Sequence, residues 1–319
     1  MAHRPGRYHS SGSVLSVVSL MSLLSQQPLF SQQGTASIVG LVRDPSGAAV
    51  PHARVTARNA QTGLSRTVET PDSGEYTLPA LDSGDYSVSA AASGFKSVVQ
   101  DGVSIQYQQT RRVDIVLPLG NISDQVSVSA TSAQLQTEDA TPSTVIDQKK
   151  VGDLPLNGRN FIQLAQLVPG TTPGAPGDGN TSFAGTGYTV SAAGQRDFNN
   201  EYTLDGISMT ETRNPAPAFL PSVDAIQEFN VQTGLFSAEY GYKAGAHVDI
   251  SIKSGTNQYH GSLFEFFRNS VFDARNFFAT SVSPLRMNQF GGTFGGRIKK
   301  DRTFFFLAYD GTRQRRSVT

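Results

Sequence analysis

The sequence predicts a mainly β protein that is built from three successive parts. Between residues 36 and 118, short segments alternate apolar and polar residues and are separated by Gly, Pro, Asp and Ser clusters. Near the C-terminal end, longer alternating segments carry many aromatic residues. The composition agrees, with 31 glycines, 10 tyrosines and 19 phenylalanines. We therefore expect a β-sandwich, then an α+β part, then long strands.

Length and charge narrow the possible functions. The 319 residues are long enough for about two or three domains. The 26 basic and 26 acidic side chains balance, so nothing favours nucleic acid as a partner. Cysteine is absent, which excludes disulfides, thiolate chemistry and a lipoprotein anchor.

The N-terminus has the layout of a secretory signal peptide. Arg4 and Arg7 precede an apolar stretch at residues 14–24, and a polar, glutamine-rich exit follows. The apolar stretch is too short to span a bilayer as a helix. We expect residues 1–31 to direct export; a disordered leader is the alternative.

The first expected domain covers residues 36–118. SIVGLV and ARVTAR alternate, and a Gly-acid-Tyr unit recurs in GEYTLPAL and GDYSVSAA. We expect Tyr76 and Tyr86 to pack at the core edge rather than to stack on a ligand. These segments, with GLVRDPSGAAVPHARV and RRVDIVL, resemble the carboxypeptidase regulatory-like domain, a transthyretin-like or Cna-B-type sandwich. This carbohydrate-binding-like fold does not itself define a function.

The sequence does not predict an enzyme. A zinc peptidase needs converging histidines and a carboxylate, but His52, His247 and His260 lie in different regions without a ligand motif. Nucleophile-elbow, Walker A and EF-hand patterns are also absent. We expect no cofactor and no metal site; Asp178, Asp197 and Asp205 are better explained as loop or turn residues.

The linker at residues 119–131 contains DQVSVSA, in which valine alternates with serine. One reading is a further strand or a plain linker. The other is a peptide that adds itself to the edge of a partner's sheet. The segment resembles the TonB box of TonB-dependent outer-membrane transporters, and that resemblance implies the inner-membrane TonB complex as partner. The expected TonB box consists of Asp124, Gln125, Val126, Ser127, Val128, Ser129 and Ala130.

Residues 132–256 resemble the plug domain of Oar-like and SusC-like TonB-dependent transporters. The resemblance rests on LPLNGRNF, AAGQRDFNNEYTLDGISM and SVDAIQEFNVQTGLFSAEYGYKAGAHVDISIKSGTN. Within it, we expect one short amphipathic helix capped by Asn157 and ended by Pro169-Gly170. Its apolar face would contain Phe161, Leu164, Ala165 and Val168. We expect AHVDISIKS to be a strand with one packed face and one wet face.

Residues 257–319 resemble the first strands of an outer-membrane β-barrel in this family of transporters. A strand at residues 259–268 is followed by a long connection, and a hairpin with a short charged turn comes next. In that hairpin Phe290, Phe294 and Ile298 share one face with glycines. Three strands cannot close a barrel, because the smallest membrane barrels have about eight. We therefore expect an incomplete barrel and a chain that is the N-terminal part of a longer transporter.

The expected function is that of the N-terminal part of a TonB-dependent outer-membrane receptor for energised uptake. The resemblance implies the TonB complex as a partner and, in the full-length form, outer-membrane lipid; the sequence does not identify the substrate. We expect the outer membrane as the location, or the periplasm if the truncation is real. The alternative is a secreted or periplasmic module in which the carbohydrate-binding-like sandwich and plug act without a barrel.

Overall fold

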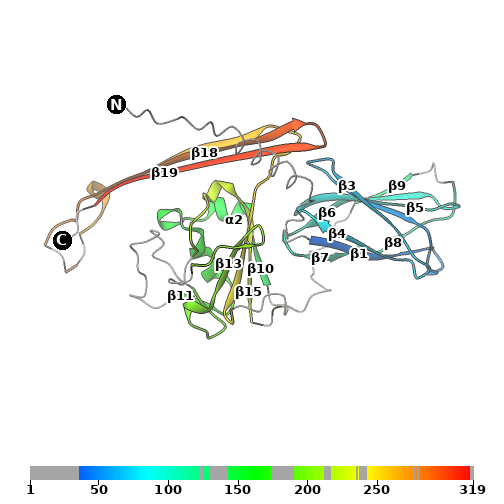
Figure 1. Cartoon of the computed structure of the whole chain (residues 1–319), viewed down its shortest axis with the longest axis horizontal. Helices are drawn as coiled ribbons and strands as arrows, with labels where there is room; N and C mark the ends of the chain where they lie inside the picture. The colour runs from blue at the N-terminus through cyan, green and yellow to red at the C-terminus, as the bar shows by residue number, and fades with distance from the viewer. Residues whose placement is uncertain are drawn as a thin grey trace, which may run out of the picture. The chain divides into compact units, whose positions relative to one another are not determined.

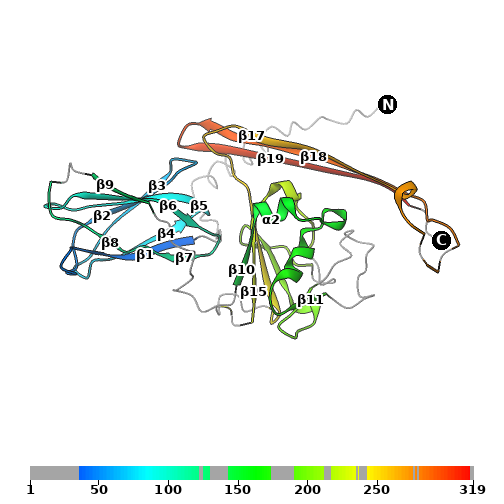
Figure 2. The same ribbon diagram turned by 180° about the vertical axis from the view of Figure 1, so that it is seen from behind.

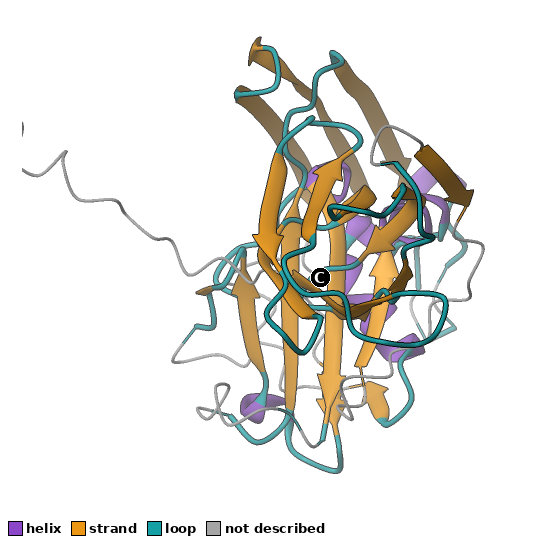
Figure 3. Cartoon of the chain, turned by 90° about the vertical axis from the view of Figure 1, so that its right-hand side faces the viewer, coloured by secondary structure: helices purple, strands orange, loops and turns teal. Residues whose placement is uncertain are grey.

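The computed structural model describes residues 36–121, 125–129, 143–173, 190–211, 217–234, 236, 243–275, 277–278 and 280–316. The predicted signal peptide, residues 1–31, lies outside these ranges. Strands dominate the described chain and helices are few, as Figure 3 shows by colour. The fold is thus mainly β, as predicted. Within these ranges, none of the helices has both the length and the hydrophobicity that crossing a membrane requires.

The first domain is a sandwich of two sheets, which are blue to cyan in Figure 1. Its strands are β1 (Ala36–Arg43), β2 (Arg54–Asn59), β3 (Ser65–Glu69), β4 (Glu75–Leu81), β5 (Gly84–Ala91), β6 (Ser97–Ile105), β7 (Thr110–Arg112) and β8 (Ile115–Val116). One sheet has the order β4-β1-β7, with β8 also paired to β1. The other has the order β3-β2-β5-β6-β9, where β9 is Gln125–Ser129.

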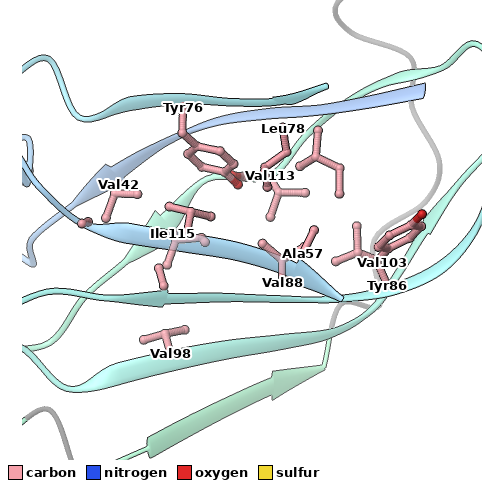
Figure 4. Packing of buried hydrophobic residues seen from close by; sticks show 14 of the residues in the cluster. Val42, Ala57, Tyr76, Leu78, Tyr86, Val88, Val98, Val103, Val113 and Ile115 are labelled. Carbon is pink, nitrogen blue, oxygen red and sulfur yellow. The ribbon is translucent and has the colours of Figure 1, made fainter. Parts of the chain in front are cut away.

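The sandwich core forms because alternate residues of both sheets point inward. Figure 4 shows Val42, Leu78, Val88 and Ile115 between the two layers. The two tyrosines close this core. Tyr76 is 4% exposed and donates a 2.6 Å hydrogen bond to the carbonyl of Val113, and Tyr86 is 5% exposed. Both pack in the core as predicted, and burial raises the pKa of each phenol.

The plug is an α+β domain around a five-stranded sheet with the order β10-β15-β16-β13-β14. Its strands are β10 (Ser143–Asp147), β13 (Glu201–Leu204), β14 (Ile207–Ser208), β15 (Ile226–Thr233) and β16 (Ala246–Ile252), and a separate pair is β11 (Thr171–Pro173) with β12 (Val190–Ala192). Helix α2 (Gln148–Asp153) follows β10 directly, as seen from behind in Figure 2. Short 3-10 turns η1 (Asn157–Arg159), η3 (Asp197–Asn199) and η4 (Val223–Ala225) connect other elements.

The expected amphipathic helix is present, but its type and its cap differ from the prediction. It is the 3-10 helix η2 (Phe161–Leu167), which buries the predicted apolar side chains. Its N-cap is Asn160, whose Oδ1 accepts a hydrogen bond from the Ile162 amide at 3.0 Å. Asn157 instead begins the separate turn η1. The prediction failed because Gly158, with φ of 67°, breaks the helical path between the two asparagines.

A buried asparagine joins three segments of the plug. Asn200 is almost fully buried, and its Oδ1 accepts a 2.9 Å hydrogen bond from the amide of Ala246 at the start of β16. Its Nδ2 donates to the carbonyl of Val190 in β12. Gly245 lies directly against this side chain, because a Cβ placed there would come 2.5 Å from Asn200 Oδ1 and 2.7 Å from the Asn199 carbonyl oxygen. The plug therefore needs glycine at position 245.

Replacing Gly245 with alanine is expected to destabilise the plug by about 1–3 kcal/mol, because the backbone must shift to relieve the clash. Hydrogen exchange of β13 and β16 amides in the full chain measures this. Gly152→Ala is the matched control: it lies in α2 with no atom within 4 Å of the added Cβ. That change should leave stability equal or slightly higher, since alanine favours helix. Equal protection in both variants would contradict the prediction.

The last three strands form one antiparallel sheet, β17-β18-β19. They are β17 (His260–Asn269), β18 (Leu285–Lys299) and β19 (Thr303–Arg316), with the 3-10 turn η6 (Ser270–Phe272) after β17. The long and short connections agree with the prediction. The register aligns Phe294 with Gly261 and Leu307 on one face. That face exposes large apolar side chains, with Leu263 93% exposed.

Candidate partner-binding strand and plug

The structure describes most of the predicted TonB box as a strand. Gln125–Ser129 form β9, while Asp124 and Ala130 lie outside the described residues. Side chains are described for Val126 and Ser127, and both are exposed. A segment with alternating small and β-branched residues favours this extended form.

β9 is not free but pairs with the sandwich. It runs parallel to β6 and is the last strand of that sheet. The register places Val126 beside Val98 and Ser127 beside Val99. The Ser127 hydroxyl donates a 3.3 Å hydrogen bond to Oδ2 of Asp101. Neither β6 nor Asp101 was singled out by the sequence, because alternation does not reveal which edge a strand will join.

The plug begins with β10, the next described strand after β9. β10 is an edge strand of the plug sheet and pairs with β15 alone. Ile146 is opposite Phe229 on β15, and both are buried. Asp147 ends the strand and caps α2, since its Oδ1 accepts a hydrogen bond from the Lys150 amide at 2.9 Å. The first described plug strand after β9 is thus an edge strand, and buried apolar side chains such as Ile146 pack it against β15.

The LNGR signature forms a loop that an ion pair between Arg159 and Asp224 holds in place. Arg159 adopts a φ of 55°, which is uncommon for a residue with a side chain. Its guanidinium forms an ion pair with Asp224 in η4, and both side chains are largely buried. Lys253 Nζ also donates to the Asp224 carbonyl at 2.7 Å, and burial lowers the pKa of Lys253 despite the nearby carboxylate. These contacts join the loop to the sheet ends.

The second face of β16 is buried, which corrects the expectation of a wet face. His247, Asp249 and Ser251 all lie below 9% exposure. Asp249 lies between Asn230 of β15 and Thr203 of β13. Thr203 donates a hydrogen bond to Asp249 Oδ1. Alternation predicted two faces correctly, but it does not tell whether a polar face is covered.

Among the described residues, several buried oxygen atoms on this polar face have no hydrogen-bond partner. They are Glu201 Oε2, Asn230 Oδ1, Gln232 Oε1 and Asp249 Oδ2. Burial, together with repulsion from Glu201, raises the pKa of Asp249 to about 6 against the Thr203 hydrogen bond. Burial also raises the pKa of Glu228 on the same sheet. Burial on this sheet therefore makes the charged forms of Asp249 and Glu228 less favourable than they are in water.

The described residues offer no obvious metal centre. Within these ranges, no three His, Asp or Glu side chains converge in a way suited to a metal ion. His52 is exposed beside Glu69, whereas His247 is buried against the edge of the Phe236 ring. Asp205 is a turn residue with φ of 47°, and its Oδ1 accepts a hydrogen bond from the Ile252 amide. Asp178 and the side chain of Asp197 lie outside what is described.

Comparison with protein families agrees with this order of parts. Residues 37–118 match the carboxypeptidase regulatory-like domain, residues 135–248 match the TonB-dependent receptor plug domain, and residues 251–319 match an outer membrane beta barrel domain. The three parts of the chain are thus similar, in this order, to parts of TonB-dependent outer-membrane receptors. The outer membrane is its location.

The similar proteins include one transporter that aligns with most of the chain. The TonB-dependent transporter Oar of Myxococcus xanthus is 27% identical over 301 residues, which are 88% of this chain and 27% of the relative. The chain therefore spans about a quarter of that relative's length. Among solved structures, the siderophore receptor PirA from Acinetobacter baumannii aligns with a TM-score of 0.42 and 21% identity, covering 54% of this chain and 24% of that one.

Proposed function

We propose that the chain acts as the energy-coupling N-terminal part of a TonB-dependent outer-membrane transporter. Residues 124–130 are its TonB box, and the TonB complex of the inner membrane is its partner. Pulling on this segment rearranges the plug, so that a substrate bound outside can pass. The observation that carries the proposal is the position of β9: a short alternating strand lies between the sandwich and a plug-family domain.

The same proposal sets the functional boundaries of the chain. The signal peptide covers residues 1–31, the sandwich 36–118, the linker with the TonB box 119–131, the plug 132–256 and the first barrel strands 257–319. The apolar face of β17 to β19 contacts outer-membrane lipid in this proposal. Its support is the exposure of Leu263, Phe294 and Leu307 on that face, since apolar surface of this extent is costly in water.

The proposal predicts that TonB binding depends on residues 124–130. Replacing them in the full chain with a Gly-Ser segment of equal length should weaken binding at least tenfold, because strand addition needs an extended, β-favouring segment. The measurement is titration with the periplasmic domain of TonB from the same bacterium. The matched control replaces residues 133–139 in the same way, and it should bind as the original chain does.

Undiminished binding after the first replacement would overturn the TonB box assignment. Equal losses from both replacements would show that the flexibility or composition of the linker matters rather than this particular sequence. The alternative function, a periplasmic module, is tested separately by fractionating cells that make the chain. That reading predicts recovery of the chain in the soluble periplasmic fraction. The transporter proposal predicts recovery with outer membranes once the chain is joined to the remaining strands of a barrel, because three strands cannot close one.

A further inference from the structure

The strand that we assign to TonB is already held by the sandwich of this chain. β9 completes the sheet β3-β2-β5-β6-β9 and pairs with β6 from Ser97↔Gln125 to Asp101↔Ser129. We propose that the β6 edge is a binding site for the TonB box, so that the sandwich and TonB compete for residues 125–129. This inference rests on the proposed function and adds a means of regulating it.

The backbone of β6 explains why the sandwich holds this segment. β6 pairs with β5 on one side and with β9 on the other. Without β9, β6 would be an edge strand with a row of unpaired N–H and C=O groups. Such an edge accepts an added strand through backbone hydrogen bonds, and this is also how a TonB box adds to a partner sheet. One short segment therefore serves two acceptor edges of the same kind.

The docked strand is held weakly enough to be exchanged. The pairing covers five residues and is parallel, which is slightly less stable per residue than antiparallel pairing. Val126 remains 36% exposed. The side-chain hydrogen bond from Ser127 to Asp101 is exposed and 3.3 Å long, so its net contribution is small. The structure thus combines a defined register with few side-chain contacts.

Docking and partner binding compete because they need the same features of β9. Half of the strand's backbone groups face β6, and Val126 lies on the side of the sheet where Val98 is buried. A partner sheet gains affinity from the backbone and specificity from pockets for alternate side chains. The docked strand leaves that partner only its outer edge, because the backbone groups on the other edge already pair with β6. Release from β6 therefore precedes tight binding to TonB.

A reversible cross-link tests this competition. The chain contains no cysteine, so a pair introduced as Val99→Cys and Ser127→Cys is unique. These positions are directly opposite in the register. Oxidation should cross-link the pair and lower the affinity for the periplasmic domain of TonB at least tenfold. Reduction of the same sample should restore it.

Two further variants sharpen the result. Val99→Cys with Ser129→Cys is the register control, because Ser129 is opposite Asp101 rather than Val99, and it should cross-link more slowly. Asp101→Ala leaves the TonB box unchanged but removes the acceptor of the Ser127 hydrogen bond. It should raise TonB affinity about twofold to fivefold, since docking competes less well.

The outcomes separate this inference from the proposed function. Failure of Val99→Cys with Ser127→Cys to cross-link would overturn docking. Equal TonB affinity of the oxidised and reduced forms would overturn competition and leave the TonB box intact. No TonB binding by the reduced variant or the original chain would instead overturn the proposed function. If TonB affinity falls on oxidation and recovers on reduction, both the proposed function and the competition between the sandwich and TonB are supported.

Discussion

Replacing Phe229 with alanine is expected to destabilise the plug by about 3–5 kcal/mol. The Phe229 ring is fully buried in the middle of β15. It lies opposite Ile146 of β10 on one side and Ile250 of β16 on the other. It also packs on Phe161 of η2, with ring centroids 5.6 Å apart. One side chain thus joins three strands and a helix, and its loss leaves a cavity that rigid neighbours cannot fill.

Hydrogen exchange in the full chain resolves this effect by domain. The amides of β15 and β16 should lose between a hundredfold and a few thousandfold of their protection. The amides of β5, in the sandwich, should keep theirs and serve as the internal reference. Phe198→Ala is the matched control, because Phe198 is 47% exposed in the same domain. It should change protection less than about threefold.

A milder variant covers the case in which the alanine protein does not accumulate. Phe229→Leu keeps most of the apolar volume and should cost about 1–2 kcal/mol. A loss of less than tenfold in the alanine variant would show that β10 and β16 do not depend on this contact. The central role of Phe229 would then be wrong.

The local secondary structure of this chain was predictable because short sequence patterns determine it. Alternation identified the sandwich strands, and the glycine–aromatic pattern with a charged turn identified the hairpin of β18 and β19. The inward positions of η2 also followed from spacing. In each case neighbours in sequence are neighbours in space, so that periodicity alone indicates which side is apolar.

Features that depend on distant partners were not predictable. Alternation in β9 was compatible with a strand, a plain linker or a docking peptide. Both edges of a strand look the same in sequence, so its parallel partner β6 was not evident. Likewise, the pattern in β16 gave a polar face without showing that His247 and Asp249 would be covered. The cap of η2 was misplaced because Gly158 diverts the backbone. These are questions of tertiary context, which single-sequence patterns do not contain.

The polar face of β16 leads to the second large prediction: Asp249→Asn should stabilise the plug at neutral pH. The Asp249 side chain is 1% exposed. Burial raises its pKa from 3.8 to about 6, so the folded plug binds this proton more tightly than the unfolded chain. The contribution of Asp249 to stability is therefore greatest below about pH 4, where the carboxyl is protonated in both states. It falls as the pH rises from about 4 to about 6, by roughly 3 kcal/mol.

The surroundings of Asp249 suit an amide. Thr203 already donates to Oδ1, and an asparagine keeps that acceptor. Among the described residues the other oxygen, Oδ2, has no donor at hydrogen-bond distance, although the nearby Gln108 side chain favours the carboxylate. In the variant an NH₂ group takes the place of Oδ2. Asn230 is directly opposite Asp249 in the strand register, and its Oδ1 has no hydrogen-bond partner among the described residues. The same is true of Oε2 of Glu201, which is close enough to Asp249 to repel its charge. An asparagine therefore adds donors where the sheet holds unused acceptors.

The measurement compares the two proteins across pH. Protection factors of β13 and β16 amides, corrected for intrinsic exchange, should match near pH 4. At pH 7.5 the Asp249→Asn plug should be more stable by up to about 3 kcal/mol. Asp153→Asn, at an exposed position in the same domain, should show no comparable change with pH. Because Glu228 also has a pKa raised by burial, some pH dependence should remain in the variant. A variant that is less stable than the original at pH 7.5 would mean that the Asp249 carboxylate is stabilised in the folded plug, and the assigned sign would be wrong.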